Sequence, residues 1–185
     1  MRNDDPIVRL FNLFADLLEY PTTALAQQTR IGTEWLAALN PQAADRLEQF
    51  QHSVGGISIE RLEEIYTRTF DMQPVSYPYV GFQLFGESYK RGAFMARLNE
   101  FYSVHGFSAG KELPDHVAVI LRFLASEPEA RTGEFGQTLI AEGLVPTLDK
   151  MTGELATQAE NPYGVVVSAL SLVVKEVVEK EMIHV

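Results

Sequence analysis

ELPDHVAVILRFLA, residues 112–125, joins a short polar turn to an uninterrupted apolar segment. The apolar side chains that recur at the three-to-four-residue spacing of one helix face are Val117, Ile120, Leu121 and Leu124. The polar turn ends in Pro114, Asp115 and His116, immediately before that face. The spacing predicts a helix that buries one side in a hydrophobic core, and it leaves the role of the polar turn to be explained.

Two interpretations of that turn stay open. An Asp in the first helical turn, next to Pro114, can cap free backbone N–H groups and interact favourably with the helix dipole. Alternatively, Asp115 binds a partner, because helical geometry places it nearly opposite the apolar face and pointing outward, with His116 at the border. Since successive helical side chains diverge by about 100°, a catalytic dyad of Asp115 with His116 is unfavourable.

The same helical spacing recurs along most of the chain. Further helices are expected at about residues 6–18, 22–40 (with a break near Gly32), 41–54, 58–70, 88–105, 134–142, 146–159 and 162–182. No segment with the two-residue period of a strand is longer than a few residues. The sequence therefore predicts an all-α fold in which residues 1–185 form a single-domain bundle of roughly seven to ten helices.

The helical pattern breaks at residues 71–78, DMQPVSYP, and an aromatic segment follows with Tyr79, Phe82 and Phe85. Such a cluster can belong to the core. It can also line an exposed apolar groove, because a short segment interrupted by glycines buries its side chains incompletely. With the acids Asp71 and Glu87 close by, such a groove would suit an amphipathic basic peptide.

Composition narrows the classes of partner. Lys and Arg number 15 against 25 Asp and Glu, which gives a formal net charge of −10. This charge disfavours nucleic acid as a partner and favours a basic peptide. The same charge is also explained if it only keeps the protein soluble. The absence of Cys excludes disulfides, Cys-ligated metals and Cys nucleophiles.

The expected location is the cytoplasm, without insertion into a membrane. The N-terminal residues carry acids and lack the basic region of a secretory signal. The most apolar segment, Val165 to Val174, is too short to span about 30 Å of hydrocarbon.

Motifs for catalysis are missing from the sequence. None of the histidines has another His four residues away, and neither a nucleophile elbow nor a phosphate-binding loop is found. We therefore predict neither a metal, a cofactor nor catalytic residues. Two alternatives stay open: a small enzyme in which His116 is a general base oriented by Glu112, and a structural subunit of a stable reductase complex.

Three segments in one order resemble a known family. They are Tyr66-x-x-x-Phe70-Asp71, the segment LFGESYKRGAFMARLNEFY with the following Gly106-Phe107, and ELPDHVAVILRFLA. Together, over about residues 58–126, they resemble the NarJ/TorD/DmsD family of redox-enzyme maturation chaperones, and most of all the NarJ-type branch, the nitrate reductase delta subunits.

The resemblance implies an all-helical, cytoplasmic, non-enzymatic chaperone. Its partner would be the apo catalytic subunit of a nitrate reductase-like molybdenum oxidoreductase, bound through its N-terminal segment, a twin-arginine signal or its remnant, until cofactor insertion. The implied client-binding residues are Tyr66, Asp71, Tyr79, Phe82, Phe85, Glu87, Glu112, Pro114, Asp115 and His116. Some branches carry Trp in the aromatic segment, whereas the only Trp here is Trp35. A monomer and a helix-exchanged dimer both remain open, with residues 71–78 as a hinge.

Overall fold

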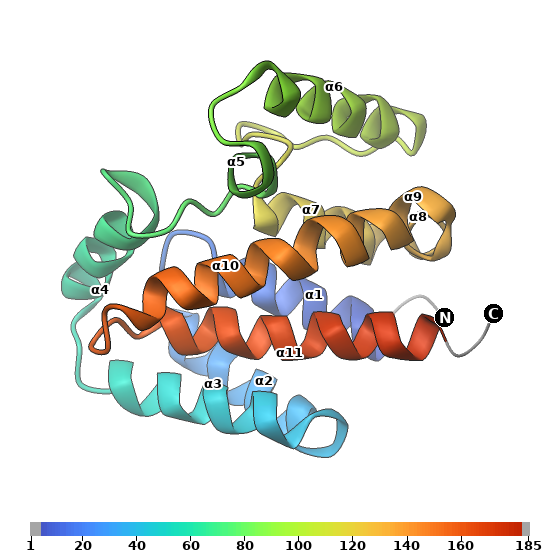
Figure 1. The fold of residues 1–185 in the computed structure, drawn as a ribbon. Coiled ribbons are helices and arrows are strands. Elements are labelled where there is room, and N and C mark those ends of the chain that lie inside the picture. Colours follow the sequence, from blue (N-terminus) through green and yellow to red (C-terminus); the bar gives the residue numbers. More distant parts are fainter. Residues whose placement is uncertain (1–4, 183–185) are drawn as a thin grey trace.

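The computed structural model describes residues 5–182, and its regular elements are all helical (Figure 1). Extended backbone pairs at one isolated bridge in this part of the chain, between Tyr79 and His116. The predicted all-α fold is therefore confirmed.

The elements follow one another in the order α1 Pro6–Leu17, α2 Leu25–Leu39, α3 Pro41–Val54, α4 Ile59–Tyr66, η1 Thr67–Asp71, α5 Val80–Phe85, α6 Tyr89–Val104, α7 Val117–Ser126, α8 Pro128–Thr132, α9 Glu134–Thr138, η2 Leu139–Leu144, α10 Val145–Ala156 and α11 Tyr163–Met182. The two η segments are π-helical. Because α4 continues into η1, and α9 continues through η2 into α10, residues 5–182 contain ten continuous helical stretches. This number lies within the predicted range.

Local capping explains where several helices begin. Asp5 accepts a hydrogen bond from the Ile7 N–H at 2.9 Å, and Asn40 accepts one from the Ala43 N–H at 2.9 Å. Each capping residue is followed by a proline at the first position of the helix, where the missing N–H costs nothing. These starts were predicted correctly.

The predicted break near Gly32 is wrong, because α2 runs through it without interruption. A Cβ atom at this position would collide with the side chains of Leu13 and Leu47. Gly32 is therefore the point at which α2 approaches α1 and α3 closely, and the residue serves packing.

One hydrophobic core joins helices from both ends of the described chain. In Figure 1, α11 runs through the middle of the molecule between α10 and α3, with α1 and α2 behind it. α1 packs against α7, and α11 packs against both α3 and α10. The apolar segment 165–174 lies inside α11, in agreement with the helix predicted for residues 162–182.

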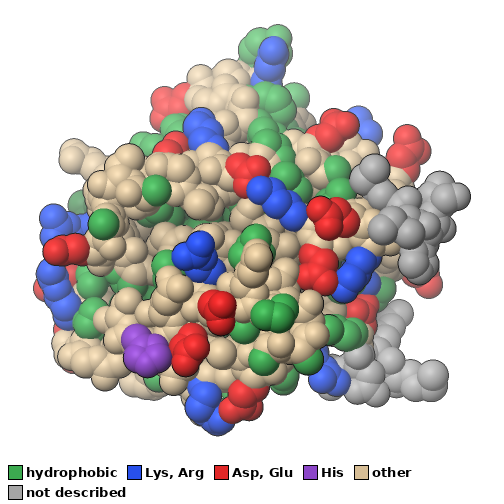
Figure 2. Space-filling view, turned by 60° about the horizontal axis from the view of Figure 1, so that its bottom comes forward, with side chains coloured by type: hydrophobic (Ala, Val, Ile, Leu, Met, Phe, Trp, Pro, Cys, Tyr) green, Lys and Arg blue, Asp and Glu red, His purple; other side chains and the backbone are tan. Residues whose placement is uncertain are grey.

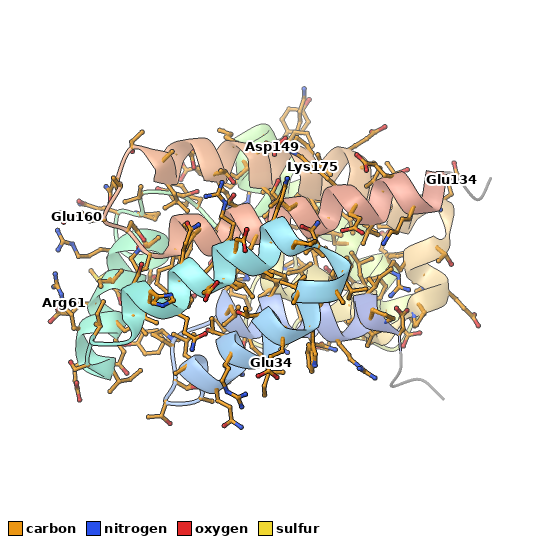
Figure 3. The ribbon with its side chains drawn as sticks, turned by 90° about the horizontal axis from the view of Figure 1, so that it is seen from below. Glu34, Arg61, Glu134, Asp149, Glu160 and Lys175 are labelled. Atoms are coloured by element: carbon orange, nitrogen blue, oxygen red, sulfur yellow. The ribbon has the colours of Figure 1, made fainter. Side chains whose placement is uncertain are left out.

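Charged pairs join helices at the rim of this bundle. Figure 3 shows Asp149 of α10 next to Lys175 of α11, and their side chains form an ion pair of 2.6 Å. On the face seen in Figure 2, acidic and basic side chains are interspersed. Within residues 5–182, no helix combines the length and the apolar character needed to cross a bilayer.

α6 stands apart from the other long helices at the top of Figure 1, and the short α5 lies between it and the bundle, where α5 also packs against α10 and η2. α6 packs mainly against α5, and among its sixteen residues only Leu98 and Tyr102 are buried. Its first residue, Tyr89, is 83% exposed. The attachment of α6 to the bundle therefore depends on a few specific contacts: the rings of Phe101 and Tyr102 pack on Phe123 of α7, with centroids 5.3 and 4.7 Å apart, and further contacts are made at the polar turn before α7.

Candidate functional site

The polar turn, Glu112 to His116, connects the elements that form the site. His116 is the N-cap residue of α7, where its Nδ1 accepts a hydrogen bond from the Ala118 N–H at 3.1 Å. The proposed capping role of Asp115 is therefore wrong, and the adjacent histidine performs it. Pro114 also lies before the helix, and its carbonyl accepts a hydrogen bond from the Tyr102 hydroxyl at 2.9 Å.

Asp115 is buried, with no exposed surface, and the prediction that it points outward is wrong. Its carboxylate accepts hydrogen bonds from Arg91, at 2.8 Å from Nε and 3.3 Å from Nη2. The helical-wheel argument failed because residues 114–116 are not helical: His116 has extended dihedral angles, with φ −65° and ψ 134°.

Backbone pairing turns this segment towards the loop before α5. The Val80 N–H donates to the Asp115 carbonyl at 2.8 Å, and the Val117 N–H donates to the Pro78 carbonyl at 2.9 Å. These two bonds form the isolated bridge between Tyr79 and His116, whose rings meet edge to face with centroids 5.1 Å apart. The loop before α5 and the polar turn before α7, which are far apart in the sequence, therefore lie side by side.

The loop itself is held from the other side by α10. The buried Ser76 hydroxyl donates to Glu154 at 2.6 Å, and the Gln83 amide donates to the same carboxylate at 3.1 Å. Lys150 donates to the Gln83 carbonyl at 3.1 Å. The aromatic segment therefore has a fixed position despite the two prolines and the irregular backbone before it.

A cleft of about 450 Å³ lies between these walls. We call it the acidic cleft; its lining residues are Glu19, Tyr20, Tyr66, Phe70, Asp71, Pro78, Tyr79, Glu112, His116 and Val119. They come from the residues that follow α1, from α4 and η1, from the loop before α5, and from the polar turn and the start of α7. The lining contains three carboxylates and four aromatic rings besides His116, and it includes no Lys or Arg.

Burial favours the neutral forms of Tyr66, Tyr79 and His116 in the cleft. Burial and the carboxylate of Glu112 raise the pKa of Tyr79 to about 12, and its hydroxyl donates to that carboxylate at 3.2 Å. Burial also raises the pKa of Tyr66, whose hydroxyl donates to the Leu18 carbonyl at 3.0 Å. Burial lowers the pKa of His116, although nearby carboxylates oppose this effect.

The predicted client-binding residues divide among several places. Tyr66, Asp71, Tyr79, Glu112 and His116 meet in the acidic cleft. The remaining five lie elsewhere: Pro114 and Asp115 are buried beside the cleft, Phe82 stacks on Tyr77, Phe85 lines another hollow, and Glu87 is exposed.

The hollow that contains Phe85 is here called the apolar groove, and its volume is about 530 Å³. It is lined by Leu84, Phe85, Phe94, Arg97, Glu134, Phe135, Thr138, Leu139, Glu142 and Gly143. Three phenylalanines contribute to it, and Arg97 lies over the ring of Phe135, 5.3 Å from its centroid. The single aromatic groove expected from the sequence is thus two separate hollows.

Sequence reasoning missed Glu19, Tyr20 and Arg91. Glu19 and Tyr20 follow α1, where only the stop signal before Pro21 drew attention to them. Arg91 stands in the segment LFGESYKRGAFMARLNEFY, which carries part of the family resemblance, but nothing in the local sequence connected it to Asp115. Among the described residues, no group of three or more His, Asp or Glu is arranged to hold a metal ion.

Comparison with known proteins places the chain in a family. Residues 35–149 match the family model described as "Nitrate reductase delta subunit". A candidate nitrate reductase molybdenum cofactor assembly chaperone NarJ of Bacillus subtilis (strain 168) is 31% identical over 135 residues, covering 70% of this chain and 72% of the relative.

Two further comparisons agree. The nitrate reductase molybdenum cofactor assembly chaperone NarJ of Escherichia coli (strain K12) is 29% identical over 83% of this chain, and the match spans 64% of that relative's length. The crystal structure of a candidate redox enzyme maturation protein from Archaeoglobus fulgidus aligns with a TM-score of 0.50 at 21% identity, over 82% of this chain and 91% of that chain, and supports the fold.

The family expected from the three sequence segments is therefore confirmed, and it covers more of the chain than those segments do. This chain belongs to the nitrate reductase delta subunit family, the NarJ-type branch of the redox-enzyme maturation chaperones.

Proposed function

We propose that this protein is an assembly chaperone of a nitrate reductase. It binds the N-terminal segment of the apo molybdenum-containing catalytic subunit in the acidic cleft and holds that subunit until the molybdenum cofactor is inserted. The names of the family and of its NarJ relatives support the client class. The observation that carries the site is the lining of the acidic cleft, with three carboxylates, four aromatic rings and no basic side chain.

This lining suits a basic, amphipathic segment. Arg and Lys side chains of the client would meet Asp71 and Glu112, since Glu19 is already paired with Arg122, at 3.0 Å from Nε and 2.8 Å from Nη2. The apolar neighbours of those client side chains would pack on the tyrosine and phenylalanine rings. The formal net charge of −10 adds a long-range attraction for a basic chain. Because binding needs only these contacts, the proposed action involves no covalent chemistry.

The arrangement supports this action better than the enzyme alternative. In that alternative, Glu112 orients His116 as a general base. Here the hydrogen bonds described for the Glu112 carboxylate come from the Tyr79 hydroxyl and the Leu113 N–H, and Nδ1 of His116 caps α7. We infer a non-catalytic role in the cytoplasm, where the apo-subunit is made and loaded.

Isothermal titration calorimetry tests the proposal. The titrant is a synthetic peptide that copies the N-terminal segment of the catalytic subunit, and a matched peptide with Gln in place of each Arg and Lys is the control. We expect the native peptide to bind, with affinity falling as salt rises, because the carboxylates of the cleft are accessible to solvent. Absence of heat at high protein concentration, for every molybdoenzyme N-terminus of the host, would contradict the proposal.

The structural-subunit alternative has a separate test. Purification of the mature reductase under gentle conditions should yield a complex without this protein if it acts as a chaperone. Its presence in stoichiometric amount in the cofactor-loaded enzyme would favour a permanent subunit instead.

A further inference from the structure

We propose that Arg91 is the positioning residue of the acidic cleft, an inference that rests on the proposed function. Arg91 does not line the cleft itself. It fixes the ring of Tyr79, and through that ring the hydroxyl that binds Glu112.

The guanidinium of Arg91 makes three contacts at once. It donates two hydrogen bonds to the buried carboxylate of Asp115, and its Cζ lies 5.2 Å from the ring centroid of Tyr79 and 5.6 Å from that of Phe82. A planar guanidinium can donate hydrogen bonds from its edge to a carboxylate while its faces stack on aromatic rings, and a compact ammonium does not have this geometry. The arrangement is therefore specific to arginine.

The surroundings leave little freedom to this pair. The side chain of Arg91 is 17% exposed and that of Asp115 is 0% exposed. A Cβ atom added to Gly81 would lie 2.7 Å from Oδ2 of Asp115 and 3.0 Å from Cγ of Arg91. Helix α5 thus packs directly on the ion pair, and the glycine makes this approach possible.

Arg91 also connects a detached helix to the cleft. At one end of α6, Arg91 binds Asp115, and near the other end the Tyr102 hydroxyl binds the carbonyl of Pro114. Both contacts are made with the polar turn, and His116 of the same turn meets the ring of Tyr79. Removal of the Arg91 side chain would leave the ring of Tyr79 without its cation and Asp115 without its partner, so the Tyr79–Glu112 wall would no longer have a fixed geometry.

A double-mutant cycle on peptide affinity tests this role. The variants are Arg91→Ala, Arg91→Lys, Tyr79→Ala and the two double variants, with Arg97→Ala as the matched control. Arg97 stands on the same helix and also lies over an aromatic ring, but at the apolar groove. Calorimetry with the native client peptide measures each dissociation constant, and thermal unfolding measures each stability.

If Arg91 acts through Tyr79, Arg91→Ala weakens binding about fivefold, which is no more than one partly solvated charged contact of the cleft contributes, but changes it less than about twofold in the Tyr79→Ala background. Arg91→Lys retains the folded state and still binds more weakly, because the ammonium cannot stack. Arg97→Ala binds as the wild type does. An equal decrease in both backgrounds, or full affinity in Arg91→Lys, would overturn the proposal. If Arg91→Ala does not fold, the Arg91→Lys cycle decides.

A readout without peptide separates this inference from the proposed function. Nuclear Overhauser effects between the ring protons of Tyr79 and His116 should be observed in the wild type and in Arg97→Ala, and should disappear in both Arg91 variants. Their persistence in Arg91→Ala would overturn the positioning role even if the client peptide binds. If they disappear as expected but the wild type binds no client peptide, the proposed function alone is contradicted.

Discussion

The acidic cleft and the apolar groove are similar in size, about 450 and 530 Å³, and both include part of a π-helical segment. Asp71 of η1 lines the cleft, whereas residues of η2 line the groove. Their chemistry differs: the cleft has tyrosine hydroxyls and carboxylates, and the groove has phenylalanine rings with Arg97 beside two glutamates. Similar volumes therefore do not imply the same ligand, and the charged end of a basic segment is better matched by the cleft.

The difference extends to what supports each hollow. The ion pair of Arg91 and Asp115 lies next to the cleft, and the side chain of Asp115 in this pair is fully buried. The acids of the groove, Glu134 and Glu142, are exposed. Substitutions beside the cleft should therefore affect folding far more than matched substitutions at the groove.

The largest effect is expected for Asp115→Ala. The substitution leaves the guanidinium of Arg91 mostly buried without its carboxylate, and breaking a buried pair in this way costs about 3–5 kcal/mol. Urea unfolding should show this decrease in the free energy of unfolding. The matched control is Glu142→Ala at the groove, for which we expect a change within about 0.5 kcal/mol. A decrease of only about 0.5 kcal/mol or less for Asp115→Ala would mean that the pair of Arg91 and Asp115 contributes little to stability.

The next effect is expected for Gly81→Ala. The new methyl group would overlap Asp115 and the ring of Phe94, and such overpacking costs about 1–3 kcal/mol. Gly92→Ala, on the exposed side of α6 with open space around it, should have the opposite sign and stabilise by about 0.5–1 kcal/mol. Thermal unfolding of both variants checks the comparison, and destabilisation by Gly92→Ala would contradict it.

The helix starts and Asp115 show where the sequence alone was sufficient to predict the structure and where it was not. The starts of α1 and α3 were predictable, because Asp5-Pro6 and Asn40-Pro41 act on N–H groups only two or three residues away. Asp115 was placed wrongly because its environment is set by backbone bonds to residues 78–80 and by a side chain 24 positions away. A helical wheel contains no such long-range information.

The candidate site follows the same rule. The resemblance supplied Tyr66, Asp71, Tyr79, Glu112 and His116, which do meet in one cleft. It could not show that Phe85 belongs to a different hollow, because that placement depends on contacts with other elements: the ring of Phe85 meets Phe94 of α6 edge to face, with centroids 5.8 Å apart, and the rest of the hollow comes largely from α9 and η2. The resemblance identified the segments that form the site, but it could not predict which side chains of those segments line the same cleft.

A smaller effect is expected from acid. Burial lowers the pKa of His116, so in the range below the ordinary histidine pKa of about 6.5 the unfolded chain binds a proton that the folded chain does not. The stability is therefore complete above that pH and falls as pH decreases, by at most about 1.4 kcal/mol per pH unit for one group.

Urea unfolding at several pH values, compared between the wild type and His116→Asn, measures this contribution. Asn retains the ability to cap α7 and carries no titrating group. The stability of the variant should therefore decrease less steeply towards acid. His52→Asn, at an exposed position of α3, should retain the wild-type profile. An identical pH dependence in His116→Asn and the wild type would contradict the assignment to His116.

The smallest effect concerns the two hollows directly, and it rests on the proposed function. Glu112→Gln removes one exposed negative charge from the acidic cleft, and a partly solvated contact of this kind contributes at most about 1 kcal/mol, or roughly fivefold in affinity. The wild type and the variant should therefore differ by up to that factor at low salt and converge as salt rises. Glu142→Gln makes the same change of charge at the apolar groove. If it weakened the client peptide as much as Glu112→Gln does, the effect would reflect net charge alone, whereas an effect confined to Glu112→Gln would assign the basic end of the peptide to the cleft.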